Sequence, residues 1–154
     1  MIALRLGEIA RITGGQVHQC FGSAEADPLV DGPVVTDSRE AAAGSLYIAR
    51  IGKAMDGHQF VAAARAQGAV AALTSRPVTD LPCVVVEDVQ VAFVSLARSL
   101  VERNARTVVL GITVSSGQTS TIALLVSLPQ LHGHACVNAC HLTLDVGAPV
   151  TVVR

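Results

Sequence analysis

The sequence predicts an α/β domain, in which helices pack on a β-sheet around one hydrophobic core. Hydrophobic periods of two and of 3.6 residues alternate along most of the chain, which is the pattern of strands and helices that follow one another. The 154 residues are 51% hydrophobic and 15% charged, a composition and length that suit one well-covered core but not two full-sized domains. Aromatic residues make up only 3% and Trp is absent. The core must therefore consist of small aliphatic side chains, which allow helices to pack closely on a sheet.

The first predicted element is a short helix with an apolar side formed by Leu6, Ile9, Ala10 and Thr13. It ends at residues 14–15, a Gly pair in which the left-handed conformation of a helix C-terminus is accessible. Three strands are expected after it, because short β-prone runs alternate with turn residues. They cover residues 16–20, 30–36 and 45–49.

The middle of the chain predicts two helices and two buried strands. Asp56 has the position of an N-cap for a helix over residues 57–67, which ends at Gly68. The clearest helical pattern places Phe93, Leu96, Ala97, Leu100 and Val101 on one side. Buried strands are expected at residues 69–73 and 83–86, followed by a further strand at 107–112.

The last of these strands leads into a Ser/Gly-rich loop with the layout of a phosphate-binding loop. Such loops surround phosphate oxygens with backbone N–H groups, and their Lys reaches the terminal phosphates. Here Gln118 stands in the lysine position and Val114 stands in place of a glycine. Loss of that charge lowers a rate roughly 100-fold or more, so ATP hydrolysis is not expected. The loop either is an ordinary strand-to-helix connection capped by Thr119 or keeps residual phosphate binding. Its residues are Thr113, Ser115, Ser116, Gly117, Gln118 and Thr119.

Charge and composition exclude several function classes. With 12 acidic and 11 basic residues, the chain does not have the positive charge of an electrostatic nucleic-acid binder. No apolar run reaches the roughly 20 residues of a membrane helix, and the first residues lack a secretory pattern. We therefore expect a cytoplasmic protein without nucleic-acid or membrane partners. Its four cysteines are expected to be free thiols, with Cys20 and Cys83 in the core.

A group of metal-ligating residue types occurs late in the chain, but its spacing is unlike that of zinc sites. It contains His132, His134, Cys136, Cys140 and His141, without the usual C-x2-C or H-x3-H spacing. These are interpreted as loop histidines beside small buried thiols, and no metal ion and no cofactor is predicted. His18 and His58 are candidate general bases, but the sequence places no nucleophile beside them, and catalytic residues remain unknown.

Several motifs occur in series along the chain. In chain order they are Thr36-Asp37-Ser38-Arg39, residues 43–49, Gly52, Asp56-Gly57-His58-Gln59-Phe60, residues 68–71 and residues 84–88. In order and spacing they resemble the N-terminal region of the Mur ligases, most closely those of the MurF type. The resemblance extends into the loop described above and to the tail at residues 145–154.

The resemblance implies a domain organisation and a ligand surface. It implies a UDP-binding N-terminal domain at residues 1–101, a linker at 102–107, and a strand-loop-helix remnant of the central ATPase domain at 108–154. The ligand-binding residues implied are Thr36, Asp37, Ser38, Arg39, Asp56, Gly57 and His58. Arg39 either binds a phosphate or carboxylate or pairs with a neighbouring acid on the surface. Asp56-Gly57-His58 either contacts the ligand or serves only as a helix cap with a turn glycine.

The departures from the family predict a protein without ligase activity. Mur ligases continue through a central ATPase domain and a C-terminal domain, which a chain of this length cannot complete. We therefore expect a truncated, non-catalytic binding or accessory module that takes a UDP-sugar or a carboxylate-bearing small molecule. A protein partner or a second copy is expected to cover the apolar side chains of the remnant, Leu110, Ile122, Leu125 and Val126.

Two other interpretations stay open on the sequence. The chain could be an enzyme subunit recruited to different chemistry in specialised metabolism, such as natural-product biosynthesis, with an active site completed by a partner chain. It could also be a decayed gene fragment. The hydrophobic pattern is orderly through at least residue 126, which is expected of a chain that still folds and argues against decay.

Overall fold

The computed structural model describes residues 3–19, 27–52 and 55–103. Several predicted features lie outside these ranges. They are Cys20, the strand at 107–112, the phosphate-loop-like residues Thr113–Thr119, the histidine and cysteine group at 132–141, and the tail.

A five-stranded mixed sheet forms the centre of the described fold, with strand order β2-β7-β6-β5-β4. The four strands β4 to β7 are parallel, while β2 pairs with β7 in the antiparallel direction. Short strands β1 (Leu4–Arg5) and β3 (Leu29–Val30) form a separate antiparallel pair. The strands of the central sheet are β2 (Gln16–His18), β4 (Val34–Val35), β5 (Ser45–Ile48), β6 (Ala69–Thr74) and β7 (Cys83–Val85).

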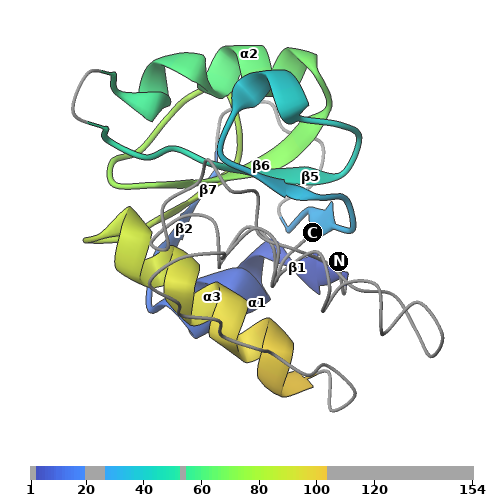
Figure 1. Cartoon of the computed structure of the whole chain (residues 1–154), viewed down its shortest axis with the longest axis vertical. Coiled ribbons are helices and arrows are strands. Elements are labelled where there is room, and N and C mark those ends of the chain that lie inside the picture. Colours follow the sequence, from blue (N-terminus) through green and yellow to red (C-terminus); the bar gives the residue numbers. More distant parts are fainter. Residues whose placement is uncertain (1–2, 20–26, 53–54, 104–154) are drawn as a thin grey trace, which may run out of the picture.

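Helices cover both faces of this sheet, as Figure 1 shows. Helices α1 (Leu6–Thr13) and α3 (Val89–Arg103) pack on one face, and α2 (Val61–Ala66) lies on the other. Two short 3-10 helices, η1 (Ser38–Glu40) and η2 (Gly57–Phe60), follow β4 and β5. The predicted α/β class is confirmed, and each face of the sheet has its own apolar layer.

Alternation along β5 divides its side chains between these two layers, because successive residues of a strand point to opposite faces. Leu46 and Ile48 pack with Phe93 and the other apolar residues of α1 and α3. Tyr47 packs in the second layer with Val61 and Ala64 of α2 and with Cys83. Cys83 is a free, buried thiol, as predicted.

The helix ends predicted from glycine positions are confirmed, although one helix differs in type. Gly14 ends α1 with a φ of 69°, which is the left-handed region that glycine favours. The segment predicted as one helix over 57–67 begins as η2 and continues as α2. Asp56 caps it as predicted, because its carboxylate accepts the His58 N–H at 3.0 Å.

The prediction of one strand over residues 30–36 is wrong. The segment divides into β3 and β4, which belong to different sheets. Pro33 lies between them and lacks an N–H for ladder hydrogen bonding. Gly32 passes so close to the next turn that a Cβ there would lie 2.5 Å from the Ala43 carbonyl oxygen. The chain therefore changes direction where the hydrophobic pattern alone indicates a continuous strand.

At the C-terminal end of the described part, α3 continues through Arg103 and so includes the first two residues of the predicted linker. Among the described helices, none combines the length and the hydropathy that a bilayer span requires.

Candidate functional site

Polar segments follow the parallel strands at one edge of the sheet. Residues 36–39 follow β4, residues 50–58 follow β5, and Ser75 and Arg76 follow β6. Parallel strands bring their carboxyl ends to the same edge, and ligands of open α/β sheets bind outside these ends. The candidate site is therefore at this edge, and it includes both segments that the sequence nominated.

The turn Asp56-Gly57-His58 is held in place by hydrogen bonds to β5 and to Arg50, which follows β5. The Gly57 N–H donates to the Arg50 carbonyl oxygen at 2.8 Å, and the Tyr47 hydroxyl donates to the Gly57 carbonyl at 3.0 Å. A Cβ on Gly57 would lie 2.6 Å from the Arg50 oxygen, so only glycine allows this approach. This close approach explains the glycine between the two polar residues.

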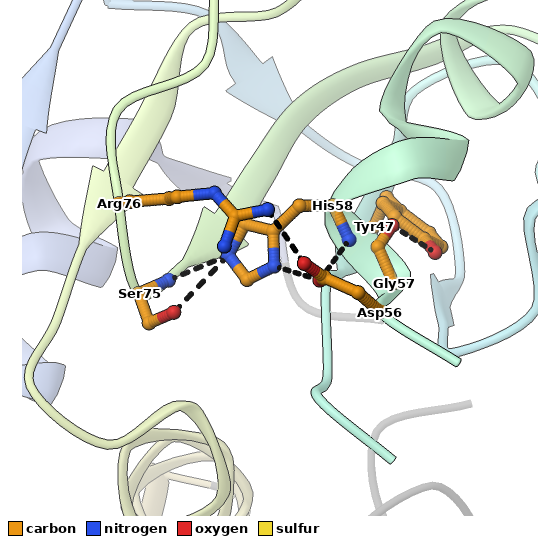
Figure 2. A network of polar contacts seen from close by, with 6 residues as sticks. All are labelled: Tyr47, Asp56, Gly57, His58, Ser75 and Arg76. Atoms are coloured by element: carbon orange, nitrogen blue, oxygen red, sulfur yellow. Dashed lines mark hydrogen bonds and ion pairs between the residues drawn. The ribbon is translucent and has the colours of Figure 1, made fainter. Parts of the chain in front are cut away.

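His58 connects this turn to the end of β6 (Figure 2). Its Nδ1 lies 2.6 Å from Asp56 Oδ1, and its Nε2 accepts the main-chain N–H of Ser75 at 3.0 Å. An imidazole nitrogen that accepts a main-chain N–H carries no proton, so this pattern assigns the ring proton to Nδ1, which donates to Asp56. The side chain is only 2% exposed, and the bonds therefore act in a largely water-excluded setting.

The order Asp56, His58, Ser75 resembles a hydrolase triad, since the Ser75 hydroxyl lies 3.2 Å from His58 Nε2. The nearer group, however, is the Ser75 N–H at 3.0 Å. Nε2 has one lone pair, and a main-chain donor that occupies it competes with removal of a proton from the hydroxyl. We therefore interpret these residues as a structural connection between two strand ends.

Asp56 also binds Arg76, whose Nη2 lies 2.5 Å from Asp56 Oδ2. The His58 N–H, the Arg76 guanidinium and the His58 ring all favour the charged carboxylate, and they hold the pKa of Asp56 well below its usual range. Figure 2 shows both carboxylate oxygens occupied, one by His58 and the other by Arg76. Asp56 is therefore an ionised anchor for groups from two different loops.

Asp37 and Arg39 form a second polar unit after β4. The Asp37 carboxylate accepts Arg39 Nε at 3.0 Å and Nη2 at 2.6 Å, and it also accepts the Arg39 main-chain N–H at 2.9 Å. These bonds lower the pKa of Asp37 to about 2. The surface ion pair that the sequence left open for Arg39 is thus present.

Tyr47 lies between the two units on β5. Burial raises its pKa to about 12, and the negative charges of Asp37 and Asp56 add to the rise. Both carboxylates are therefore within electrostatic range of one phenol. Tyr47 pairs with Val35 directly before the first nominated segment, and its hydroxyl bonds Gly57 of the second.

Sequence reasoning missed three members of the site, namely Tyr47, Ser75 and Arg76. Each had a signal that could have found it: Ser75 and Arg76 come soon after the buried strand predicted at 69–73, as Asp37 follows the strand predicted at 30–36. Tyr47 is the single tyrosine of the chain and carries a hydroxyl into a buried layer. Of the nominated residues, Thr36 is partly exposed and Ser38 is buried. Within residues 3–19, 27–52 and 55–103, no three His, Cys, Asp or Glu side chains are grouped as metal ligands are.

The site lies inside a region that matches a known family. A model described as "Mur ligase family, catalytic domain" matches residues 33–108. The chain is 34% identical to the UDP-N-acetylmuramoyl-tripeptide--D-alanyl-D-alanine ligase of Escherichia coli K12, in a match that covers 100% of this chain and 32% of that protein. The protein of the same name from Mycobacterium tuberculosis H37Rv is 32% identical, with 100% of this chain and 34% of that protein covered.

Solved structures agree with these matches. A crystal structure of MurF from Acinetobacter baumannii superposes with a TM-score of 0.82 at 28% identity, covering 98% of this chain and 33% of that chain. MurF from Thermotoga maritima in complex with ADP gives a TM-score of 0.68 at 27% identity, covering 80% of this chain and 29% of that chain. The chain is MurF-like. It spans about one third of the length of the curated relatives it matches.

Proposed function

We propose that this MurF-like chain binds the nucleotide end of a UDP-linked sugar peptide at the carboxyl edge of its sheet. One observation carries the proposal: the segments 36–39 and 56–58 both lie at the carboxyl ends of the adjacent parallel strands β4 and β5, where α/β sheets bind ligands. The matched ligases are named for a UDP-N-acetylmuramoyl tripeptide, which supplies the ligand class. As part of this proposal, residues 1–101 form the UDP-binding domain.

In this proposal Arg39 contacts an acidic group of the ligand. Its side chain is 87% exposed, and Asp37 holds its Nε and Nη2, so the remaining N–H donors point in a fixed direction. Thr36 adds a partly exposed hydroxyl group in the same segment, whereas Ser38 is buried. A held guanidinium loses less conformational entropy on binding than a free one, which favours recognition of a phosphate or carboxylate.

We further propose that the chain acts as a binding or accessory module and does not catalyse ligation by itself. Support comes from the sequence, in which Gln118 and Val114 replace the lysine and a glycine of a phosphate loop. Without that lysine, the charge that develops on the transferred phosphate lacks its cation, at a cost of about 100-fold or more in rate. Partner binding is supported by Val91 and Val94, which are 62% and 46% exposed on the outer side of α3.

Calorimetric titration of the full chain with UDP-N-acetylmuramoyl tripeptide tests the binding proposal. We expect saturable binding that Arg39→Ala weakens strongly, while Arg98→Ala leaves it unchanged, because Arg98 is a similarly exposed arginine paired with Glu102 on α3. Absence of binding with this ligand and with every other UDP-sugar would refute the proposal. ADP formation by the chain alone, dependent on D-alanyl-D-alanine, would refute the non-catalytic part.

A further inference from the structure

We infer that His58 is a pH-sensitive switch, which joins the 56–58 turn to the end of β6 while its ring is neutral and releases that end when the ring takes up a second proton. The switch comprises Asp56, His58, Ser75 and Arg76 (Figure 2). The inference goes beyond the proposed function and does not rest on it, because the switch consists only of side chains and main-chain groups of this chain.

The hydrogen bond to Ser75 requires the neutral ring. The Nε2 atom of His58 accepts the Ser75 N–H at 3.0 Å, and a ring nitrogen accepts only while it carries no proton. A main-chain N–H is always a donor, so it cannot adapt when Nε2 becomes a donor as well. A proton on Nε2 therefore places two N–H donors opposite each other, and this hydrogen bond must break.

Ser75 also offers the charged ring a different partner. Its hydroxyl oxygen lies 3.2 Å from the same Nε2, and a hydroxyl can accept as well as donate. A protonated Nε2 can donate to this oxygen once Ser75 has shifted. The site thus has two hydrogen-bonded arrangements, in which the neutral ring accepts the main-chain N–H and the charged ring donates to the hydroxyl.

The second connection between the turn and β6 weakens at the same time. Asp56 Oδ2 lies 2.5 Å from Arg76 Nη2, and Asp56 Oδ1 lies 2.6 Å from His58 Nδ1. A charged ring is a second cation on this carboxylate, so His58 and Arg76 repel each other. The Arg76 side chain is 54% exposed and can move into solvent, whereas the His58 side chain is 2% exposed. Protonation therefore displaces Ser75 and Arg76 together.

The neighbouring charges act on the second proton in opposite directions. Asp56 favours it, and the pKa of this carboxyl is held well below its usual range, so the carboxylate stays ionised where histidine titrates. Arg76 opposes it. Tyr47 stays neutral there, because its pKa is raised to about 12. Other titratable side chains on the surrounding elements are Arg50 after β5, Arg65 on α2, Asp80 and Cys83 before and on β7, and the paired Asp37 and Arg39 after β4.

Acid shifts the switch toward its open form. The closed form binds no proton at Nε2 and the open form binds one, so the open population rises as the pH falls. Histidine changes charge between about pH 8 and pH 5, and we expect the change within this range. The sheet itself should stay paired, because the bond from the Ala49 N–H to the Leu73 carbonyl, at 2.9 Å, does not involve the ring.

An NMR titration of the isotope-labelled full chain from about pH 8 to pH 5 tests the inference. At the upper limit the single ring proton of His58 should lie on Nδ1. As the ring gains its second proton, the Ser75 amide signal should move with the same midpoint, while the Ala49 amide signal stays in place. Arg76→Gln removes the like charge and should raise this midpoint by about half a pH unit or more.

His58→Gln is the matched variant, because its amide oxygen can accept the Ser75 N–H and does not titrate. The Ser75 signal should not respond to pH in this variant. His18→Ala is the control for an exposed histidine on β2, and the Ser75 response should persist in it.

The inference is overturned if the Ser75 signal stays in place while the His58 ring becomes charged, or if the ring is still neutral at about pH 5. A Ser75 response that persists in folded His58→Gln also overturns it. The titration of the unaltered chain is decisive by itself, so the test does not depend on whether His58→Gln folds.

Discussion

Replacing His58 with alanine is the sharpest test of the connection between the ends of β5 and β6. The substitution removes a side chain that is 2% exposed and that bonds Asp56 on one side and Ser75 on the other. Asp56 keeps Arg76 and the main-chain N–H of residue 58 as partners. The Ser75 N–H loses its acceptor in a partly buried position. This donor then either binds a water molecule or stays unpaired.

The expected loss of unfolding free energy follows from these contacts. A hydrogen bond contributes about 1 kcal/mol net, and His58 makes one to Asp56 and one to the Ser75 N–H, with the Ser75 hydroxyl as a weaker third contact. Truncation of a buried ring adds a cavity cost of about 1 kcal/mol. The sum is about 3 kcal/mol, which lowers Tm by roughly 10 °C for a chain of this size.

Urea unfolding followed by circular dichroism measures this loss, and fluorescence of Tyr47 reports on the site itself because the chain has one Tyr and no Trp. His18→Ala is the matched control, since His18 is exposed on β2 and its loss should change stability by less than about 0.5 kcal/mol. His58→Gln offers an amide acceptor to Ser75 and should recover part of the loss. A His58→Ala protein as stable as His18→Ala would refute the role assigned to His58.

Further predictions concern the same turn. Gly57→Ala should destabilise the chain by about 2 kcal/mol or more, because the added Cβ would lie 2.6 Å from the Arg50 oxygen; an unchanged urea midpoint would contradict the close approach. Acid should weaken the fold through Asp56, whose pKa is lower in the folded than in the unfolded chain. Its stabilising effect is present above the unfolded pKa near 3.8 and is lost as pH falls below that value. In the Asp56→Asn variant, the unfolding free energy should therefore decline less steeply between about pH 5 and pH 2. An equally steep decline in this variant would contradict the stabilising role of the ionised Asp56 carboxylate.

Elements defined by local chemistry were predictable from the sequence. Gly14 ends α1 because a left-handed residue is needed there, and Asp56 caps the following helix because its carboxylate reaches the His58 N–H. Both depend on neighbours within a few residues. The apolar stripe of α3 was equally clear, since Phe93, Leu96 and Leu100 are buried as their spacing predicts.

Features that depend on distant parts of the chain were not predictable in this way. Residues 30–36 divide between two sheets because β3 pairs with β1 and β4 pairs with β5. The local hydrophobic pattern does not indicate either pairing. The partners of His58 follow from the pairing of β5 with β6, which brings Ser75 to a histidine 17 positions earlier. The sequence nominated His58 without a partner for this reason.

The site network is contained within one crossover unit of the sheet. Its hydrogen bonds join Tyr47, Asp56, Gly57, His58, Ser75 and Arg76, all within β5, the segment through α2, and the end of β6. Each of these hydrogen bonds joins two residues between positions 47 and 76. The non-catalytic part of the proposed function depends instead on Gln118, which lies outside the described residues and outside this network. The proposed function therefore treats binding and catalysis separately, and ligand affinity at the carboxyl edge can be measured without any assumption about the reaction.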